Sequence, residues 1–382
     1  MDLPEEVVVN IIARLPMQSI VRFRLVCREW KSLTESAFFR DLYHSTSNST
    51  SCNWSILYGD YRSLRPSLKQ VKLDLPSSHG NNNPSFPFCF TPTNNEIKKI
   101  TVVASTDGLV LLRLYEEDKK MIRYYIGNPV LPQWIQLPPP PPPKVDYMPF
   151  TDSGLVTRMH NNVALLGYKV VRIFSQALLF TSRTWRFETY SSDTGQWSIT
   201  QVCRPGAALS RIDTSNPVTL NGKLHWLDHL GCIFVHDFFS HDDQVRAISL
   251  PEKLQCGPDT CRKIIFTTSQ GYCVLVDAQL IEEVNSYNVR IWRLNSDCWS
   301  WGKAWEINMA SVGLGSSCVP MAINYFDIDV IYLWDSEEKC FLAFNRRTLA
   351  KSYGARKADT FSSSKPFSCL SQFVPSLHVV PT

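Results

Sequence analysis

Histidines are the first residues in this 382-residue sequence that could do chemistry. His225 and His229 are four residues apart, a spacing that on a helix would suit a metal ion. Asn221-Gly222 precedes them, and this dipeptide is a type I′ turn signal that predicts a hairpin with His225 on the returning strand. We therefore expect no metal site at this pair, and we expect no cofactor in the chain.

A denser polar cluster consists of His236, Asp237, His241, Asp242 and Asp243. Phe238 and Phe239 interrupt it, and its Ser-His-Asp-Asp stretch has the composition of a turn, which favours a solvated loop. The glycine-rich segment 313–317 carries neither the Lys-Ser/Thr of a phosphate loop nor the Gly-x-Ser-x-Gly of a nucleophile elbow. These patterns indicate no catalytic constellation, so we expect a protein that is not an enzyme.

The twelve cysteines include no Cys-x-x-Cys pair, and the closest two are Cys256 and Cys261. Zinc-site spacing is therefore absent, and a chain of this length does not need disulfides to be stable. The sequence starts with acidic residues where a signal peptide would be basic, and it has no apolar stretch long enough to span a membrane. We expect a cytoplasmic or nuclear protein that does not contact membranes.

The composition narrows the class of protein further. Apolar residues make up 44% of the chain and aromatic residues 12%, which excludes wholesale disorder. Charged residues make up only 19%, which is typical of a β-rich chain with few surface helices. The net charge of +4 is spread without long basic runs, so nucleic-acid binding is not expected.

The elements that must position functional side chains fall into two regions, and the first is helical. Val8, Ile11, Ile12 and Leu15 follow at spacings of three and four, which predicts one apolar helical face before Pro16 ends the helix. Similar spacings predict two or three more short helices before residue 43. So small a module cannot bury a stable core alone. Its apolar side chains must be covered by the rest of the chain or by another protein, and both alternatives stay open.

This region resembles an F-box, through Leu3–Glu6, Ile11–Pro16 and Arg22–Leu33. Ile20 stands where the family commonly has Leu, and Leu25 where many members have Cys, but both positions stay apolar. The resemblance implies a module that binds the small Skp-type adaptor of a cullin–RING ubiquitin ligase. By the same resemblance, the residues that would face the adaptor are Leu3, Pro4, Ile12, Leu15, Pro16, Val26, Cys27 and Trp30.

The second region reads as strands. Residues 44–53 are rich in Ser, Thr and Asn, which indicates a linker, and short apolar runs broken by turn residues then predict an all-β domain. An aromatic-ended strand, a polar turn and a strand with a bulky start recur five times, as in Tyr190 to Trp197. The closing residues lie 63, 48, 54 and 42 positions apart, which favours the four-stranded blades of a β-propeller over two stacked sandwiches.

This region resembles the plant-type F-box-associated domain, a divergent kelch-like propeller. The matching segments are 107–110, 127–129, 167–172, 190–197, 220–226 and 291–292, and they occur in the family's order. We expect an F-box at 1–43, a linker at 44–53 and a propeller of about six to seven blades at 54–382. The segment 373–377 resembles the strand that closes the ring.

Six consecutive prolines, Pro138–Pro143, must form a polyproline II rod. Such a rod could be a ligand for SH3- or WW-type grooves. Because it lies inside the repeat array, we favour a stiff connection between blades.

Together the two resemblances imply a substrate-recognition adaptor of a Skp–cullin–F-box (SCF) ubiquitin ligase. The F-box would dock on the Skp-type adaptor, and the propeller would bind a target protein for ubiquitination and proteasomal degradation. Such a chain supplies proximity and does no chemistry itself. Two alternatives remain: a ligand-binding or enzymatic propeller with a helical cap, and an F-box scaffold that acts outside a ligase. The residues that would bind the target cannot be predicted.

Overall fold

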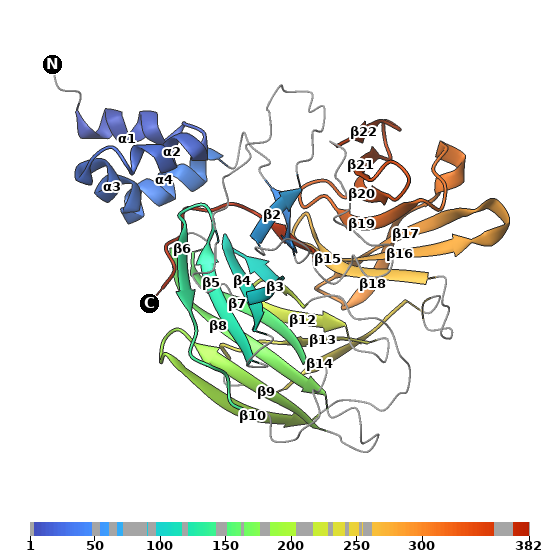
Figure 1. Cartoon of the computed structure of the whole chain (residues 1–382), viewed down its shortest axis with the longest axis horizontal. Helices are drawn as coiled ribbons and strands as arrows, with labels where there is room; N and C mark the ends of the chain where they lie inside the picture. The colour runs from blue at the N-terminus through green and yellow to red at the C-terminus, as the bar shows by residue number, and fades with distance from the viewer. Residues whose placement is uncertain are drawn as a thin grey trace.

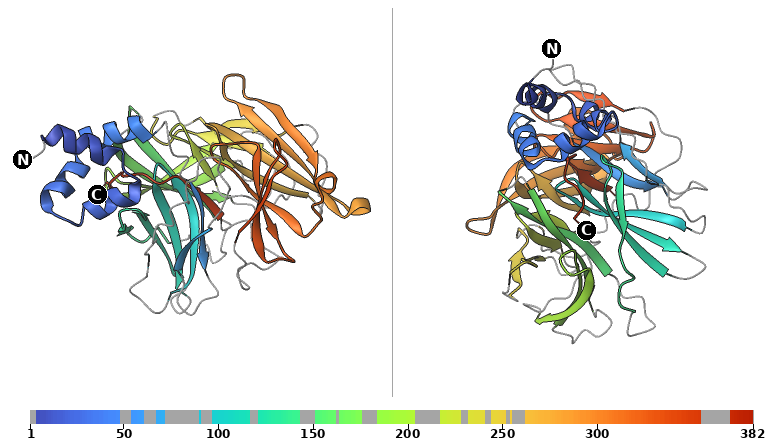
Figure 2. Two further views of the ribbon diagram at one scale, coloured as in Figure 1. Left: turned by 90° about the horizontal axis from the view of Figure 1, so that it is seen from above. Right: turned by 90° about the vertical axis from the view of Figure 1, so that its left-hand side faces the viewer.

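The computed structural model describes residues 4–47, 54–60, 67–71, 90, 97–116, 121–142, 151–161, 164–175, 184–203, 217–227, 232–240, 244–251, 254, 262–354 and 370–381. Among these residues, four helices form a module at the N-terminal end, and the strands form a ring of six sheets (Figure 1). The helical module lies at one side of the ring, and the C-terminal segment runs from the ring to that module (Figure 2).

The four helices are α1 (Glu5–Ala13), α2 (Met17–Phe23), α3 (Arg28–Glu35) and α4 (Ala37–Ser47). Pro4 and Pro16 directly precede α1 and α2, where their fixed φ suits the start of a helix and the missing N–H costs little. Ser36 starts α4, because its hydroxyl accepts a hydrogen bond from the Phe39 backbone N–H at 3.1 Å. The expectation of three to four short helices is confirmed.

The end of α4 differs from the sequence expectation. Composition indicated a linker from residue 44, but α4 continues to Ser47. The Thr46 hydroxyl lies 2.8 Å from the Leu42 carbonyl oxygen and 3.3 Å from that of Ala13, at the end of α1. A contact with another helix therefore stabilises a segment whose residue types are poor helix formers. Residues 48–53 lie outside the described residues.

Five sheets each use four strands that are consecutive in sequence, and we call them the first to fifth blades. The first blade consists of β3 (Ile97–Thr106), β4 (Leu109–Glu116), β5 (Met121–Asn128) and β6 (Gln133–Gln136). The second blade consists of β7 (Thr151–His160), β8 (Ala164–Ser175), β9 (Thr184–Ser191) and β10 (Gln196–Cys203). The third blade is β11 (Val218–Leu220), β12 (Lys223–Leu227), β13 (Cys232–His236) and β14 (Arg246–Ser249). The fourth blade consists of β15 (Arg262–Ser269), β16 (Tyr272–Ile281), β17 (Ser286–Asn295) and β18 (Ser300–Asn308). The fifth blade consists of β19 (Cys318–Ile323), β20 (Val330–Asp335), β21 (Cys340–Asn345) and β22 (Lys351–Tyr353).

The sixth sheet, the closing blade, combines both ends of the ring. Within it, β1 (Ser55–Asp60) pairs antiparallel with β2 (Ser67–Val71) on one side and with β23 (Leu370–Phe373) on the other. The C-terminal strand therefore closes a six-blade propeller, as expected from its resemblance. The strand ends at Phe373, earlier than the expected segment 373–377, and Pro375 just beyond it has no N–H to donate to a sheet.

Six buried apolar clusters fill the six interfaces between neighbouring blades. Strand β4 shows why its sequence is continuously apolar: Leu109 and Leu111 face the second blade, while Val110 and Leu112 face the closing blade. Strand β4 is thus buried on both faces and loses the alternation of a strand in a half-exposed sheet. Two stacked sandwiches would leave outer faces in water, and the ring is confirmed over that alternative.

The turns between the first two strands of several blades share one geometry. Asp107-Gly108, Asn221-Gly222 and Gln270-Gly271 each place two successive residues at positive φ, as a type I′ turn requires. The Asn221-Gly222 turn puts His225 on the returning strand β12, opposite Val218 on β11. The hairpin predicted from this dipeptide is confirmed.

Buried carboxylates paired with arginines hold strands together inside four of the blades. The pairs are Glu116 with Arg123, Glu188 with Arg172 and Arg186, Asp277 with Arg262 and Arg290, and Asp329 with Arg346 and Arg347. All four carboxylate side chains are at most 2% exposed. Buried charges of this kind are tolerated because each has an opposite charge beside it.

Tryptophans tie adjacent blades through their ring nitrogens. The Trp197 Nε1 of the second blade donates to the Pro138 carbonyl oxygen at 2.9 Å, and the Trp301 Nε1 of the fourth donates to the Ser249 carbonyl oxygen at 3.0 Å. The first contact anchors the start of the polyproline run, which agrees with a stiff connection between blades. No helix in the described ranges is both long and apolar enough to cross a membrane.

Candidate docking surface

Helix α1 is apolar on two opposite faces. Its inner face carries Val9, Ile12 and Ala13, which are buried at spacings of three and four. Its outer face carries Val7 and Ile11, which are 41% and 51% exposed. A helix that only packs on its own chain needs a single apolar face. The outer face of α1 is therefore a surface that a partner can cover.

A second apolar patch lies in the loop between α2 and α3. Leu25 and Val26 are 84% and 65% exposed, although the residues around them are held firmly. The Cys27 sulfur accepts a hydrogen bond from the Trp30 backbone N–H at 3.5 Å and so caps α3. The Trp30 ring packs on Phe23, with centroids 4.7 Å apart. The loop thus presents two large apolar side chains on a fixed backbone.

Charged side chains fix α3 beside this loop. Arg24 forms an ion pair with Glu35 at the end of α3. A hydrogen bond with its own backbone N–H, and a second with the Cys27 side chain, lower the pKa of Glu29 in the first turn of α3. An anionic side chain is favoured at this end of a helix.

The residues expected to face a partner differ in how far their side chains are exposed. Pro4, Pro16 and Val26 are exposed, and a half-buried set consists of Leu15, Cys27 and Trp30. Leu3 lies outside the described residues. Ile12 departs from the expectation, because it is only 3% exposed and packs inward with Val9 and Ala13. The structure places Ile12 in the core of the module.

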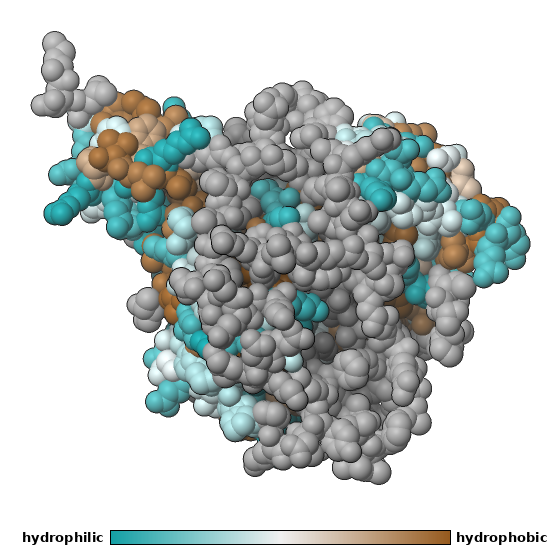
Figure 3. All heavy atoms as spheres, in the orientation of Figure 1, coloured by the Kyte–Doolittle hydropathy of each residue, from teal (hydrophilic) through white to brown (hydrophobic). Residues whose placement is uncertain are grey.

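The structure adds four exposed residues that were not expected to face a partner: Val7, Ile11, Leu25 and Phe38. Phe38, in the first turn of α4, is 63% exposed. A surface pocket on α1 is lined by Glu6, Val7, Asn10, Ile11, Arg14 and Leu15. Apolar atoms gather over the helical module in the space-filling view (Figure 3). The sequence signal was available, because α1 holds more apolar residues than one helical face can take.

Two protein families match this chain. A family described as F-box protein At3g26010-like, β-propeller, matches residues 52–372, and the F-box domain matches residues 1–41. The chain belongs to the F-box proteins with a β-propeller. The expected resemblance to this family is thereby confirmed, and the exposed apolar residues described above lie within the F-box.

Curated relatives of this F-box protein come from Arabidopsis thaliana. F-box protein At1g49990 is 32% identical over 88% of this chain and 83% of its own length. Putative F-box protein At3g23950 is 34% identical over 91% of this chain and 84% of its own length. F-box protein At3g26010 is 31% identical over 89% of this chain and 76% of its own length. Among solved structures, a chain of a nidogen/laminin complex aligns over 85% of this chain and 99% of its own at 12% identity, with a TM-score of 0.40 that supports no argument.

The histidines of the propeller have structural contacts. Burial lowers the pKa of His225 to about 4, and its Nδ1 lies 3.1 Å from the Lys223 carbonyl oxygen. His236 stacks on the Phe187 ring with its Nδ1 3.1 Å from the Gln244 carbonyl oxygen. The Asp237 carboxylate accepts hydrogen bonds from the backbone N–H groups of Phe239 and Ser240, whereas His229 and residues 241–243 lie outside the described residues. In the part of the chain that is described, no group of three or more His, Cys, Asp or Glu residues could hold a metal ion.

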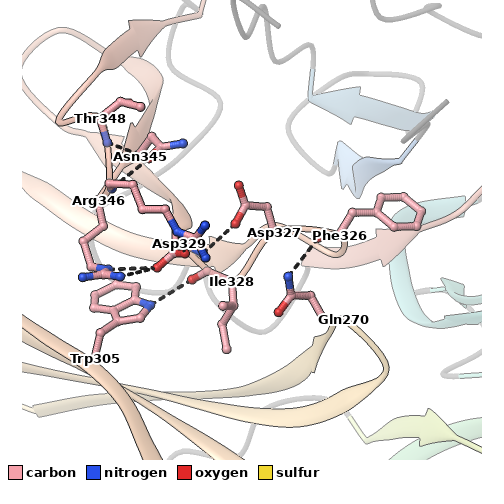
Figure 4. Close-up of polar contacts among 10 residues, drawn as sticks. Gln270, Trp305, Phe326, Asp327, Ile328, Asp329, Asn345, Arg346 and Thr348 are labelled. Carbon is pink, nitrogen blue, oxygen red and sulfur yellow. Dashed lines mark hydrogen bonds and ion pairs between the residues drawn. The ribbon is translucent and has the colours of Figure 1, made fainter. Parts of the chain in front are cut away.

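A group of polar contacts around Asp329, at the edge of the fifth blade, stabilises the structure (Figure 4). The Asp329 carboxylate is 2% exposed and pairs with Arg346 at 2.8 Å and with Arg347. The Trp305 Nε1 donates to the Ile328 carbonyl oxygen at 3.0 Å, and the Arg346 guanidinium lies over the Trp305 ring. Two arginine side chains therefore hold the buried carboxylate in place. The cluster joins the fourth blade to the fifth.

The middle of the ring is bridged by side chains. Gln372 on β23 accepts a hydrogen bond from the Thr267 hydroxyl on β15 at 2.8 Å and donates one to the Ile323 carbonyl oxygen on β19 at 2.8 Å. One amide therefore links three blades around the central axis.

Proposed function

We propose that this F-box protein is the substrate-recognition adaptor of an SCF-type ubiquitin ligase. Its F-box docks on a Skp-type adaptor, and through that adaptor on a cullin–RING ligase. Its propeller binds a target protein and holds it close to a ubiquitin-conjugating enzyme. The chain acts as a non-catalytic subunit in the cytoplasm or nucleus.

The observation that carries this proposal is the two-faced α1. A helix that served only to cap the propeller would need one apolar face, whereas α1 keeps Val7 and Ile11 in water in addition to its buried face. Leu25 and Val26 add a second exposed pair from the same small module. Exposed apolar residues gathered on a small part of a surface are typical of protein–protein contacts. An interface of ordinary size needs about 800 Å² from each partner.

Binding to a purified Skp-type adaptor tests the proposal. We expect Ile11→Glu to abolish stable binding, because a carboxylate on the outer face of α1 would be buried without a partner at the interface. The measurement is isothermal titration calorimetry of the full chain with the adaptor, supported by co-purification.

Leu166→Glu is the matched control, because Leu166 on β8 is also 51% exposed but lies on the propeller. The control should bind as the unchanged protein does. No binding by the unchanged protein, or equal loss in both variants, would contradict docking through the F-box.

A further inference from the structure

The chain does not end at the closing strand, and the residues beyond it are buried. Residues 374–381 form no helix or strand. Even so, Ser376, Leu377, His378 and Val380 are each at most 5% exposed. Buried backbone without secondary structure needs other partners for its polar groups. We call this segment the C-terminal tail.

One asparagine supplies partners for the tail backbone. The Asn128 Nδ2 donates to the Ser376 carbonyl oxygen at 3.0 Å and to the His378 carbonyl oxygen at 2.8 Å. The Asn128 Oδ1 accepts a hydrogen bond from the Val130 backbone N–H at 2.9 Å. The Nδ2 group of this fully buried amide therefore seats the tail against the end of β5, while the Oδ1 bond to Val130 holds the amide itself in place.

The Asp107-Gly108 turn forms the rest of the seat. The Asp107 carbonyl oxygen lies 3.0 Å from the Ser376 hydroxyl and 2.9 Å from the His378 Nδ1. Gly108 lies against Ser376, and a Cβ placed on this glycine would be 1.9 Å from the Ser376 Oγ. No other residue type fits there, also because φ is +77°. Two segments that resemble the F-box-associated domain, 107–110 and 127–129, thus have a shared physical role.

The tail also shares an apolar cluster with the F-box helices. Leu377 is part of one apolar cluster with Val9, Ile20 and Phe39 of the helices, and this cluster extends into the closing and first blades. Val380 belongs to the separate cluster between the first and second blades. Figures 1 and 2 show the C-terminal segment running from the ring to the helical module. The tail therefore belongs to the apolar core that the F-box helices share with the closing and first blades.

We propose that the C-terminal tail fixes the orientation of the F-box relative to the propeller, with Asn128 and Leu377 as positioning residues. Without the tail, the two domains would be joined by the chain between α4 and β1 and by a smaller apolar contact. Resting on the proposed function, the consequence is that a target on the propeller is held at one fixed distance and direction from the adaptor. A loose junction would lower the effective concentration of the target at the conjugating enzyme.

A distance measurement within the full chain tests this inference. Dyes attached through non-natural amino acids at Ser32 on α3 and Glu283 in the fourth blade, both exposed, report the F-box-to-propeller distance by single-molecule fluorescence energy transfer. We expect one narrow distance population in the unchanged protein. Leu377→Ala and a chain ending at Val374, which keeps β23, should lose that single population and give a broad distribution.

Val380→Ala is the matched control, because it shortens an equally buried tail residue that packs between blades and not on the helices. It should keep the narrow population, and near-ultraviolet circular dichroism should show the propeller folded in each variant. A broad distribution in the unchanged protein, or a narrow one in both tail variants, would overturn the inference. Affinity for the Skp-type adaptor, measured separately, should be unchanged in Leu377→Ala. If the unchanged protein does not bind the Skp-type adaptor, the proposed function is contradicted, but the measured distance distributions still decide whether the tail fixes the F-box on the propeller.

Discussion

At the scale of single residues, His225 shows how burial selects a protonation state. The side chain is 4% exposed on β12, and burial lowers its pKa to about 4. In the unfolded chain the imidazole titrates near pH 6.5. Between these two values the unfolded state binds a proton that the folded state does not. Stability contributed by the neutral imidazole is therefore complete above pH 6.5 and declines as pH falls toward 4.

This difference predicts a pH-dependent free energy of unfolding. Lowering the pH from 7 to 5 should cost about 2 kcal/mol through His225 alone. His225→Gln removes the titrating group, so the free energy of unfolding of this variant should fall less between pH 7 and pH 5 than that of the unchanged protein. Urea unfolding at the two pH values measures the difference, and the exposed His160→Gln serves as control. Equal pH dependence in His225→Gln and the unchanged protein would contradict the assignment.

The orientation of α1 marks the limit of residue-level prediction. The spacing of Val8, Ile11, Ile12 and Leu15 predicted an apolar helical face, and the helix is present. The buried face is instead centred on Val9 and Ile12, about one residue away. Where neighbouring residues are all apolar, periodicity cannot tell which of them face the core, because burial depends on helices that pack from elsewhere in the sequence.

At the scale of elements, the fourth blade is joined across three strands by charge. Asp277 on β16 is fully buried and lies 3.0 Å from Arg262 on β15 and 3.2 Å from Arg290 on β17. Both arginine side chains are 11% exposed. Removing the carboxylate would leave two nearly buried guanidinium groups facing each other.

We therefore predict that Asp277→Asn lowers the free energy of unfolding by about 3 kcal/mol, the usual cost of breaking a buried ion pair. Asp297→Asn, in an exposed turn of the same blade, should change it by less than about 0.5 kcal/mol. Chemical denaturation of both variants at pH 7 gives the comparison. Similar values for the two variants would show that the buried pair is not stabilising.

The repeated strands were predictable from the sequence to a large extent. Four of the five aromatic repeats, including Tyr190 to Trp197, join the third and fourth strands of a blade, as in the hairpin of β9 and β10. The fifth, Trp334 to Phe341, joins β20 and β21, the second and third strands, which accounts for its short spacing. Both kinds of hairpin contain the third strand of a blade, and the aromatic pattern does not tell whether that strand comes first or second in the hairpin. Strand identity within a blade therefore needs the pairing partners.

At the scale of the whole molecule, the ring is closed by strands from its two ends. Ile56 on β1 lies opposite Val71 on β2 and Gln372 on β23. A blade assembled in this way leaves no contiguous repeat in the sequence, so the count of six to seven blades could not be narrowed to six. The target-binding residues were equally out of reach, because they depend on which surfaces the folded ring exposes.

Loss of the closing strand should open the ring. A chain ending at Gly354 lacks β23, and we expect it to lose cooperative unfolding and to aggregate, because one edge of β1 and parts of three apolar clusters become exposed. A chain ending at Val374 keeps β23 and should still unfold cooperatively. Calorimetry and size-exclusion chromatography of both chains decide between these outcomes. A cooperative transition at an unchanged midpoint in the shorter chain would rule out closure by β23.

The central claim is that one chain connects a captured target to a ubiquitin ligase. Its most direct test is to compare proteins captured by the unchanged chain and by Ile11→Glu in cells and to quantify ubiquitin-remnant peptides on each. We expect both chains to capture the same propeller-bound proteins, with ubiquitination of at least one of them lost in the Ile11→Glu cells. Equal ubiquitination of every shared captured protein in the two cell lines would contradict the claim and favour a scaffold that acts outside a ligase.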